Sequence, residues 1–185
     1  MLEKNIGEVL ISQEELQGKV KELGNEITKY YKAKDGELIL ICILKGSVVF
    51  LGDLMKEIKL PLKIDFMKIS SYGEGMISSR EVKIQQDLEE SIYNKNILII
   101  EDIIDTGLTL NKVLDLLKTR EPASIKMCTL LNKPDRREAE VEIDFEGFKI
   151  PDKFVVGYGL DFAEKYRNLP YIGVIKENDN EWWIW

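Results

Sequence analysis

The strongest structural signal in this chain is the stretch Ile97-Leu98-Ile99-Ile100-Glu101-Asp102-Ile103-Ile104-Asp105-Thr106-Gly107-Leu108-Thr109. Its four leading apolar residues are too few for a helix and predict a strand buried on both faces, as strands of parallel sheets are. Two adjacent acids follow, and a turn with one glycine then leads into a helix predicted over residues 109–118. A strand, a short turn and a helix together form the unit from which parallel α/β sheets are built.

The sequence on both sides of this stretch continues the alternation of strands and helices. Ser12 and Glu15 have the spacing of a capping box, and the apolar stripe behind them predicts a helix of about five turns that ends at Asp35-Gly36. A second helix is predicted over 48–58. Strands are predicted over residues 38–44, 63–70, 83–85, 97–100, 125–131, 154–157 and 171–175. The predicted fold class is α/β, a parallel twisted sheet flanked by helices on both faces.

The length of 185 residues predicts a single domain over residues 1–185. The strand–helix alternation covers a core of about residues 12–144. Residues 1–11 and 145–185 do not fit this alternation, and we expect them to pack together as a small lobe over the edge of the sheet. Residues 71–79 are rich in Ser and Gly and lack periodicity, which predicts a mobile loop.

Charge and composition exclude several classes of protein. The net charge is −7 and no apolar run is long enough to cross a bilayer, so we expect neither a nucleic-acid partner nor a membrane. The start of the chain leads into no apolar segment of the kind found in secretory signals. Cys42 and Cys128 each lie within an apolar run and are interpreted as buried thiols of a reducing compartment. The expected location is the cytoplasm.

The absence of histidine from the sequence restricts the chemistry further. Ser-His-Asp and Cys-His catalysis and zinc sites that need histidine are excluded. Acid–base chemistry must therefore use Asp, Glu, Lys or Tyr, and any metal is expected to be a hard, oxygen-ligated ion such as Mg²⁺.

The candidate binding residues follow strands, because ligands of open parallel sheets bind at the carboxyl ends of the strands. The segment from Asp105 to Thr109 suits a phosphate, since glycine permits close backbone approach and the first N–H groups of a helix face an anion. Carboxylates facing the hydroxyls of a cis-diol, or a Mg²⁺, explain the neighbouring acids Glu101 and Asp102. Together the two parts indicate a site for a ribose 5-phosphate unit.

All thirteen positions of residues 97–109 resemble the phosphoribosyl-pyrophosphate motif of type I phosphoribosyltransferases, and Asp105 resembles the hypoxanthine-guanine branch of that family. The resemblance continues in order and spacing through residues 44–47, 71–73, 133–137, 154–161 and 165–173. It implies the type I phosphoribosyltransferase fold with a small hood lobe, and Mg²⁺ as cofactor. The implied reaction of purine salvage transfers the 5-phosphoribosyl group from phosphoribosyl pyrophosphate to N9 of hypoxanthine or guanine, giving IMP or GMP and pyrophosphate.

The resemblance also implies a role for each matching residue. Asp105 would be the catalytic acid or base near N7 of the purine. The phosphoribosyl group would be bound by Glu101, Asp102, Asp105, Thr106, Gly107, Leu108 and Thr109. Pyrophosphate would be bound by Lys45, Gly46, Ser71, Tyr72 and Arg167. The purine would be bound by Lys133 at its 6-oxygen, by Phe154 through stacking, by the backbone of Val155 and by Asp161. The metal ligands would be Glu101, Asp102 and Asp161.

Two alternatives to this function stay open on the sequence. The first is a phosphoribosyltransferase-fold regulator that binds RNA, which would need a basic surface and is disfavoured by the net charge of −7. The second is a xanthine-preferring phosphoribosyltransferase, which differs only in the base. The expected partners are the small-molecule substrates and copies of this chain, in a homodimer or homotetramer.

Overall fold

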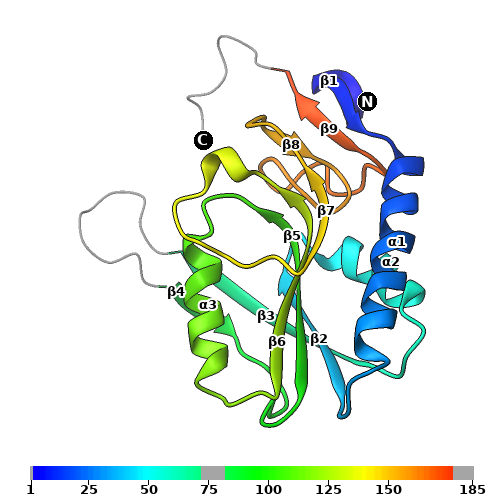
Figure 1. Cartoon of the computed structure of the whole chain (residues 1–185). Helices are drawn as coiled ribbons and strands as arrows, with labels where there is room; N and C mark the ends of the chain where they lie inside the picture. Colours follow the sequence, from blue (N-terminus) through cyan, green and yellow to red (C-terminus); the bar gives the residue numbers. More distant parts are fainter. Residues whose placement is uncertain (1, 72–81, 177–185) are drawn as a thin grey trace.

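The main sheet has six strands in the order β4-β3-β2-β5-β6-β7 (Figure 1). The computed structural model describes residues 2–71 and 82–176. The strands of this sheet are β2 (Leu38–Leu44), β3 (Lys63–Ser71), β4 (Val82–Gln86), β5 (Asn96–Ile104), β6 (Ser124–Asn132) and β7 (Phe145–Lys149). All neighbouring pairs are parallel except β3 and β4. The predicted α/β class is therefore confirmed.

Helices cover both faces of this sheet, as predicted. The helices α1 (Gln13–Tyr31) and α2 (Val48–Glu57) lie on one face, and α3 (Leu108–Lys118) lies on the other (Figure 1). Side chains of β2 alternate between the two layers, because successive residues of a strand point to opposite faces. Leu40 and Cys42 join the core beneath α1 and α2, whereas Ile39 and Ile41 join the core beneath α3.

The first helix begins at the predicted capping box. The backbone N–H of Glu15 donates to Oγ of Ser12 (3.2 Å), and the backbone N–H of Ser12 donates to Oε2 of Glu15 (2.8 Å). The helix ends at Tyr31, four residues before the predicted end at Asp35. Tyr31 is the last apolar anchor of the stripe, and its ring is buried in the core. The polar residues after it have no core contact to extend the helix.

The ends of the chain form a second, small antiparallel sheet in the order β1-β9-β8. Its strands are β1 (Ile6–Ile11), β8 (Val155–Val156) and β9 (Ile172–Ile175), and a 3₁₀ turn, η1 (Leu2–Asn5), precedes it. The small sheet lies beyond the carboxyl ends of β2, β5 and β6 (Figure 1). It therefore stands beside the edge where ligands of such folds bind.

Residues 145–149 differ from the expected boundary of the lobe. They form β7, which pairs with β6 from Cys128 to Asn132 and so belongs to the main sheet. Phe145 packs edge-to-face on Tyr30 of α1, with ring centroids 5.8 Å apart. This aromatic contact crosses more than a hundred residues of sequence and leaves no periodic signal in the short strand. The predicted strand over 154–157 is likewise shorter in the structure, at Val155–Val156.

Cys42 and Cys128 are buried free thiols, as predicted. Both pair with Ile100 of the central strand, from opposite sides. Two strand spacings separate them by roughly 10 Å, too far for a disulfide. Within the described residues, no helix is long and apolar enough to span a membrane.

Candidate active site

The acid pair Glu101 and Asp102 lies inside β5 rather than after it. β5 continues to Ile104, because Ile103 and Ile104 pair with Leu131 and Asn132 of β6. The predicted strand stops at Ile100, because the two acids interrupt the apolar run from which a buried strand is predicted. The longer strand gives both carboxyl groups a rigid backbone at the carboxyl edge of the sheet.

Ser47 lies beneath the acid pair and holds it. The side chain of Ser47 is fully buried, and its Oγ donates to Oε2 of Glu101 (3.0 Å). Oγ of Ser47 also accepts a hydrogen bond from the backbone N–H of Asp102 (3.1 Å). Gly46 lies against Asp102 so closely that a Cβ at position 46 would be 1.5 Å from Oδ2 of Asp102. The turn after β2 is therefore shaped to the acids of β5, its neighbour in the sheet.

Burial, and then the charge of a neighbouring acid, raise the pKa of both Glu101 and Asp102. The pKa of Glu101 lies well above its ordinary value, mainly because of burial and then because of the charge of Asp102. Burial raises the pKa of Asp102 to about 6, although the backbone N–H of Ile103, which donates to its Oδ1 (2.8 Å), opposes this rise. Two such carboxyl groups favour a partner that supplies hydroxyl donors or positive charge.

The segment predicted to bind a phosphate, residues 105–109, leads into the start of α3. Gly107 is the N-cap, with a left-handed φ of 79° that favours glycine. The backbone N–H of Leu108 donates to Oγ1 of Thr106 (3.4 Å), and the first N–H groups of α3 have no partner within the helix. The loop is held from below, because the N–H groups of Glu138 and Ala139 both donate to the carbonyl of Thr106 (2.9 and 3.0 Å). The first N–H groups of α3 therefore lie at the same edge of the sheet as the acid pair, in an arrangement that suits an anion.

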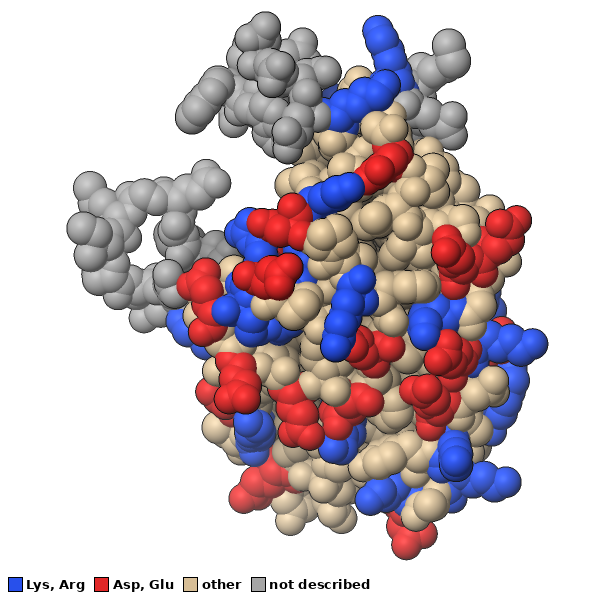
Figure 2. Space-filling view, turned by 45° about the horizontal axis from the view of Figure 1, so that its top comes forward, with Lys and Arg blue, Asp and Glu red and all other residues tan. Residues whose placement is uncertain are grey.

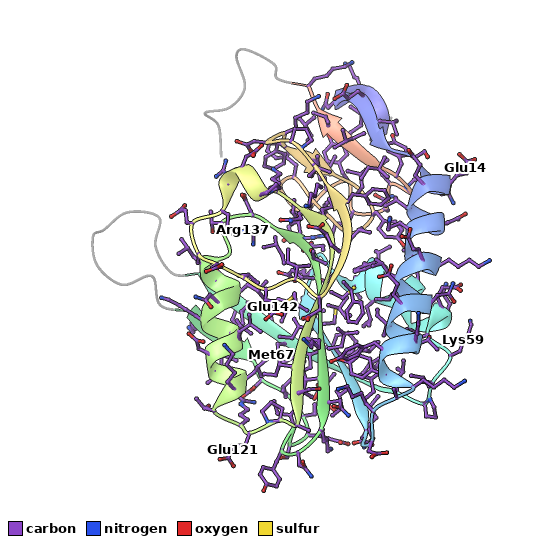
Figure 3. The ribbon with its side chains drawn as sticks, in the orientation of Figure 1. Glu14, Lys59, Met67, Glu121, Arg137 and Glu142 are labelled. Carbon is purple, nitrogen blue, oxygen red and sulfur yellow. The ribbon has the colours of Figure 1, made fainter. Side chains whose placement is uncertain are left out.

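Asp105 forms an ion pair that the sequence did not suggest. Its Oδ1 lies 3.0 Å from Nε of Arg136, which belongs to the 3₁₀ turn η2 (Pro134–Arg136) after β6. The contact is an ion pair rather than a hydrogen bond, because Oδ1 of Asp105 has no hydrogen-bond partner among the described residues. A second arginine, Arg137, lies at the same end of the sheet, whereas Glu121 lies at the opposite end (Figure 3).

The residues predicted to bind the purine lie on both sheets. Lys133 follows β6, is 7% exposed, and its Nζ donates to the carbonyl of Lys153 (2.6 Å). The backbone N–H of Lys133 donates to the carbonyl of Ile104 (2.9 Å), which holds its main chain beside the start of the segment from Asp105 to Thr109. Phe154 is 47% exposed and stands edge-to-face on Phe162, with centroids 5.5 Å apart. Val155 belongs to β8, the edge strand of the small sheet, so one side of its backbone pairs with no other described strand.

The two cations predicted to bind pyrophosphate share one carboxylate. Lys45 follows a cis peptide bond, and its Nζ lies 2.9 Å from Oε2 of Glu164. NH2 of Arg167 lies 3.4 Å from Oε1 of Glu164 and 2.7 Å from Oδ1 of Asp161, while its NH1 donates to the carbonyl of Gly159 (2.8 Å). The hydrogen bond from Lys45 lowers the pKa of Glu164.

Of the two pyrophosphate residues predicted on the loop over 71–79, only Ser71 lies among the described residues. Ser71 is the last residue of β3 and pairs with Val82. Tyr72 lies outside the described residues, as does nearly all of the predicted loop over 71–79.

The structure does not bring the three predicted metal ligands into one cluster. Among residues 2–71 and 82–176, no group of three acidic or thiol side chains is arranged to hold a metal. Asp161 is instead paired with Arg167, although it is near enough for its charge to raise the pKa of Asp102. One or two carboxylates still fit Mg²⁺, which usually completes its octahedral shell with water and substrate phosphates.

Several residues of this edge carry no signal that sequence reasoning used. Ser47, Arg136 and Glu164 each contact a predicted site residue, and none was predicted to have a role. Ser47 and Arg136 lie within the matching stretches 44–47 and 133–137, which was the signal available for them. Two hollows, of about 410 and 530 Å³, lie elsewhere and are lined by none of the predicted site residues.

Comparison with known proteins agrees with this geometry. The family model described as phosphoribosyl transferase domain matches residues 11–163. The hypoxanthine phosphoribosyltransferase of Buchnera aphidicola is 58% identical over 172 residues, which are 93% of this chain and 97% of that protein. The hypoxanthine-guanine phosphoribosyltransferase of Bacillus subtilis is 54% identical over 176 residues, 95% of this chain and 97% of the relative.

A solved structure points the same way. The crystal structure of a hypoxanthine phosphoribosyltransferase from Staphylococcus aureus superposes with a TM-score of 0.88 at 51% identity, covering 93% of this chain and 92% of that one. With a family match over most of its length and relatives above 50% identity, the chain belongs to the phosphoribosyl transferase family, in its hypoxanthine-guanine branch.

Proposed function

We propose that this protein is an enzyme of purine salvage that transfers the 5-phosphoribosyl group of phosphoribosyl pyrophosphate to N9 of hypoxanthine or guanine. The products are IMP or GMP and pyrophosphate. In this reaction the bond from C1′ to N9 forms, and the bond from C1′ to the pyrophosphate oxygen breaks with its electrons leaving on pyrophosphate. The relatives that carry these enzyme names cover nearly the whole chain.

The observation that carries the proposal is the meeting of three sites at one edge of the sheet. The acid pair in β5 and the glycine-capped start of α3 suit the ribose and its 5-phosphate. The backbone hydrogen bond from Lys133 to Ile104 holds the main chain of this buried lysine next to the end of β5, which supports a role for it beside them. Lysine only donates hydrogen bonds, so it suits the 6-oxygen of hypoxanthine or guanine and not the amino group of adenine.

The residues of this edge would divide the chemistry among them. Asp105 would take the proton from N7 of the purine as N9 attacks, because the chain has no histidine to act as base. Lys45 and Arg167 would neutralise the charge that develops on the departing pyrophosphate, which would replace Glu164 as their ion-pair partner. Glu101 and Asp102 would accept hydrogen bonds from the ribose hydroxyls and so orient C1′ for attack.

Mg²⁺ is the expected cofactor, and its bound form would supply charge neutralisation for the pyrophosphate group of the substrate. Glu101, Asp102 and Asp161 are the acids within reach of such an ion. We also propose that the protein works in the cytoplasm on small-molecule substrates as a homodimer or homotetramer. The buried reduced thiols Cys42 and Cys128 support a reducing compartment.

The two alternatives gain no support. An RNA-binding regulator would need a basic surface, but on the face shown in Figure 2 the Lys and Arg side chains of the described residues are interspersed with Asp and Glu. The three relatives named above carry the names of hypoxanthine or hypoxanthine-guanine enzymes, and none is named as a xanthine-preferring enzyme or a regulator.

The test is a steady-state assay of hypoxanthine, guanine, xanthine and adenine with phosphoribosyl pyrophosphate and Mg²⁺. We expect turnover of hypoxanthine and guanine, and none of comparable rate with adenine. Excess EDTA should abolish the activity and leave the melting temperature unchanged, because the described core contains no structural metal cluster. Failure to convert any 6-oxopurine, or full activity in EDTA, would contradict the corresponding part of the proposal.

A further inference from the structure

A chain of alternating charges joins the proposed acid–base residue to the proposed base-binding lysine. Oδ1 of Asp105 lies 3.0 Å from Nε of Arg136, and NH1 of Arg136 lies 3.5 Å from Oδ1 of Asp152. The same oxygen of Asp152 lies 3.7 Å from Nζ of Lys133. The four residues come from three segments, which follow β5, β6 and β7 in the sheet.

Asp105 differs from the neighbouring acids Glu101 and Asp102 in how its side chain is held. Glu101 is held by the hydroxyl of Ser47, and Asp102 by the backbone N–H of Ile103. The buried Oδ1 of Asp105, by contrast, has no hydrogen-bond partner among the described residues. Arg136 forms the ion pair with this oxygen, at 3.0 Å. The next residue, Arg137, donates to the side chain of Asn132, and its charge also interacts with Asp105 without forming an ion pair with it.

The separation between Asp105 and Lys133 matters because N7 and the 6-oxygen lie on the same edge of a 6-oxopurine. The backbone hydrogen bond from Lys133 to Ile104 fixes the two main chains, and Nζ of Lys133 is held by the carbonyl of Lys153. Oδ1 of Asp105 has no such hydrogen bond to fix its orientation. Oδ1 of Asp152 lies near both Lys133 and Arg136, so the orientation of one cationic side chain is coupled to that of the other.

We propose that Arg136 is a positioning residue, which aims Asp105 at N7 while Asp152 ties it to the lysine at the 6-oxygen. The inference rests on the proposed function of Asp105 and Lys133. Side chains of Asp105, Arg136 and Asp152 are each 40–55% exposed, at 42%, 47% and 52%. Ion pairs this exposed contribute little to stability, so removing Arg136 affects the rate of the reaction rather than the fold.

The experiment measures four variants of the full-length protein with hypoxanthine. Arg136→Ala should lower the single-turnover rate about tenfold, because a misaimed catalytic group loses part of its effect. The dissociation constant of phosphoribosyl pyrophosphate should stay within about twofold of wild type, since Arg136 contacts the carboxylate of Asp105, which is proposed to face the purine, and its other side-chain partner is Asp152. Arg136→Lys should restore part of the rate. Asp152→Asn should lower it less, and adding it to Arg136→Ala should cause no further loss.

Arg120→Ala is the matched control, because Arg120 forms a similarly exposed ion pair with Asp87 at 2.8 Å, far from the carboxyl edge. It should leave the rate unchanged. An unchanged rate in Arg136→Ala overturns the inference, as does a loss that Arg136→Lys does not restore or that is matched by weaker binding of phosphoribosyl pyrophosphate. Wild-type protein that converts neither hypoxanthine nor guanine would refute the proposed function instead.

Discussion

Gly46→Ala should disable the ribose site without unfolding the protein. A Cβ at this position would lie 1.5 Å from Oδ2 and 2.6 Å from Cγ of Asp102, whereas carbon and oxygen atoms in contact need about 3.3 Å or more. The turn has no room to retreat, because the carbonyl of Gly46 lies so close to Gly159 that a Cβ there would be 2.0 Å from it. The carboxylate of Asp102 must therefore swing away by about 2 Å.

The cost of this movement falls on function. Turning Asp102 breaks its hydrogen bond with the N–H of Ile103, which contributes about 0.5–1.5 kcal/mol to stability. Misplacing a substrate-positioning group by about 1 Å can lower the rate about 100-fold. We therefore expect kcat/KM for phosphoribosyl pyrophosphate to fall about 100-fold, which corresponds to about 2.7 kcal/mol of transition-state stabilisation.

The assay compares steady-state kinetics and urea unfolding of Gly46→Ala with those of Gly52→Ala. Gly52 lies in α2, and a Cβ there meets no atom within 4 Å. Alanine in place of a helical glycine stabilises by about 0.5–1 kcal/mol, so the control should unfold at higher urea with unchanged kinetics. If Gly46→Ala keeps kcat/KM within about threefold of wild type, the argument that Gly46 makes room for Asp102 is wrong.

Three further outcomes follow from contacts at the site and on the surface. Glu164→Gln should tighten the binding of pyrophosphate up to about fivefold in isothermal titration, because Lys45 and Arg167 then have no ion pair with Glu164 to break before they bind it. Weaker binding would contradict this. Lys133→Gln should lower the rates on hypoxanthine and guanine and narrow the gap to adenine by tenfold or more, since an amide both donates and accepts; an unchanged ratio would rule out its role. The hydrogen bond from Arg120 lowers the pKa of Asp87 in the folded protein. The stability that this pair adds is therefore present above the pKa of Asp87 in the unfolded chain, about 4, and is lost as the pH falls through its pKa in the folded protein. Asp87→Asn should therefore be less stable than wild type at pH 7 and equally stable in strong acid, as measured by urea unfolding at each pH.

From the amino-acid sequence alone, strands β2 to β6 of the main sheet and the segment proposed to bind the phosphate could be predicted. Local signals carry both. The strand over 38–44 agrees with β2 residue for residue, and the capping box at Ser12 places the start of α1, because apolar runs and caps act within a few residues. The cradle from Asp105 to Thr109 is one contiguous loop, so its chemistry can be seen in the order of its residues.

The way in which distant residues complete the proposed site could be seen only in the folded chain. The hydroxyl of Ser47 supports Glu101 across 54 residues, and the carboxylate of Glu164 reaches Lys45 across 119. Arg136 pairs with Asp105 because β5 and β6 end side by side. The place of residues 145–149 at the edge of the main sheet was also decided there. Such contacts depend on which strand ends meet, and periodicity records only which face of its own strand a residue occupies.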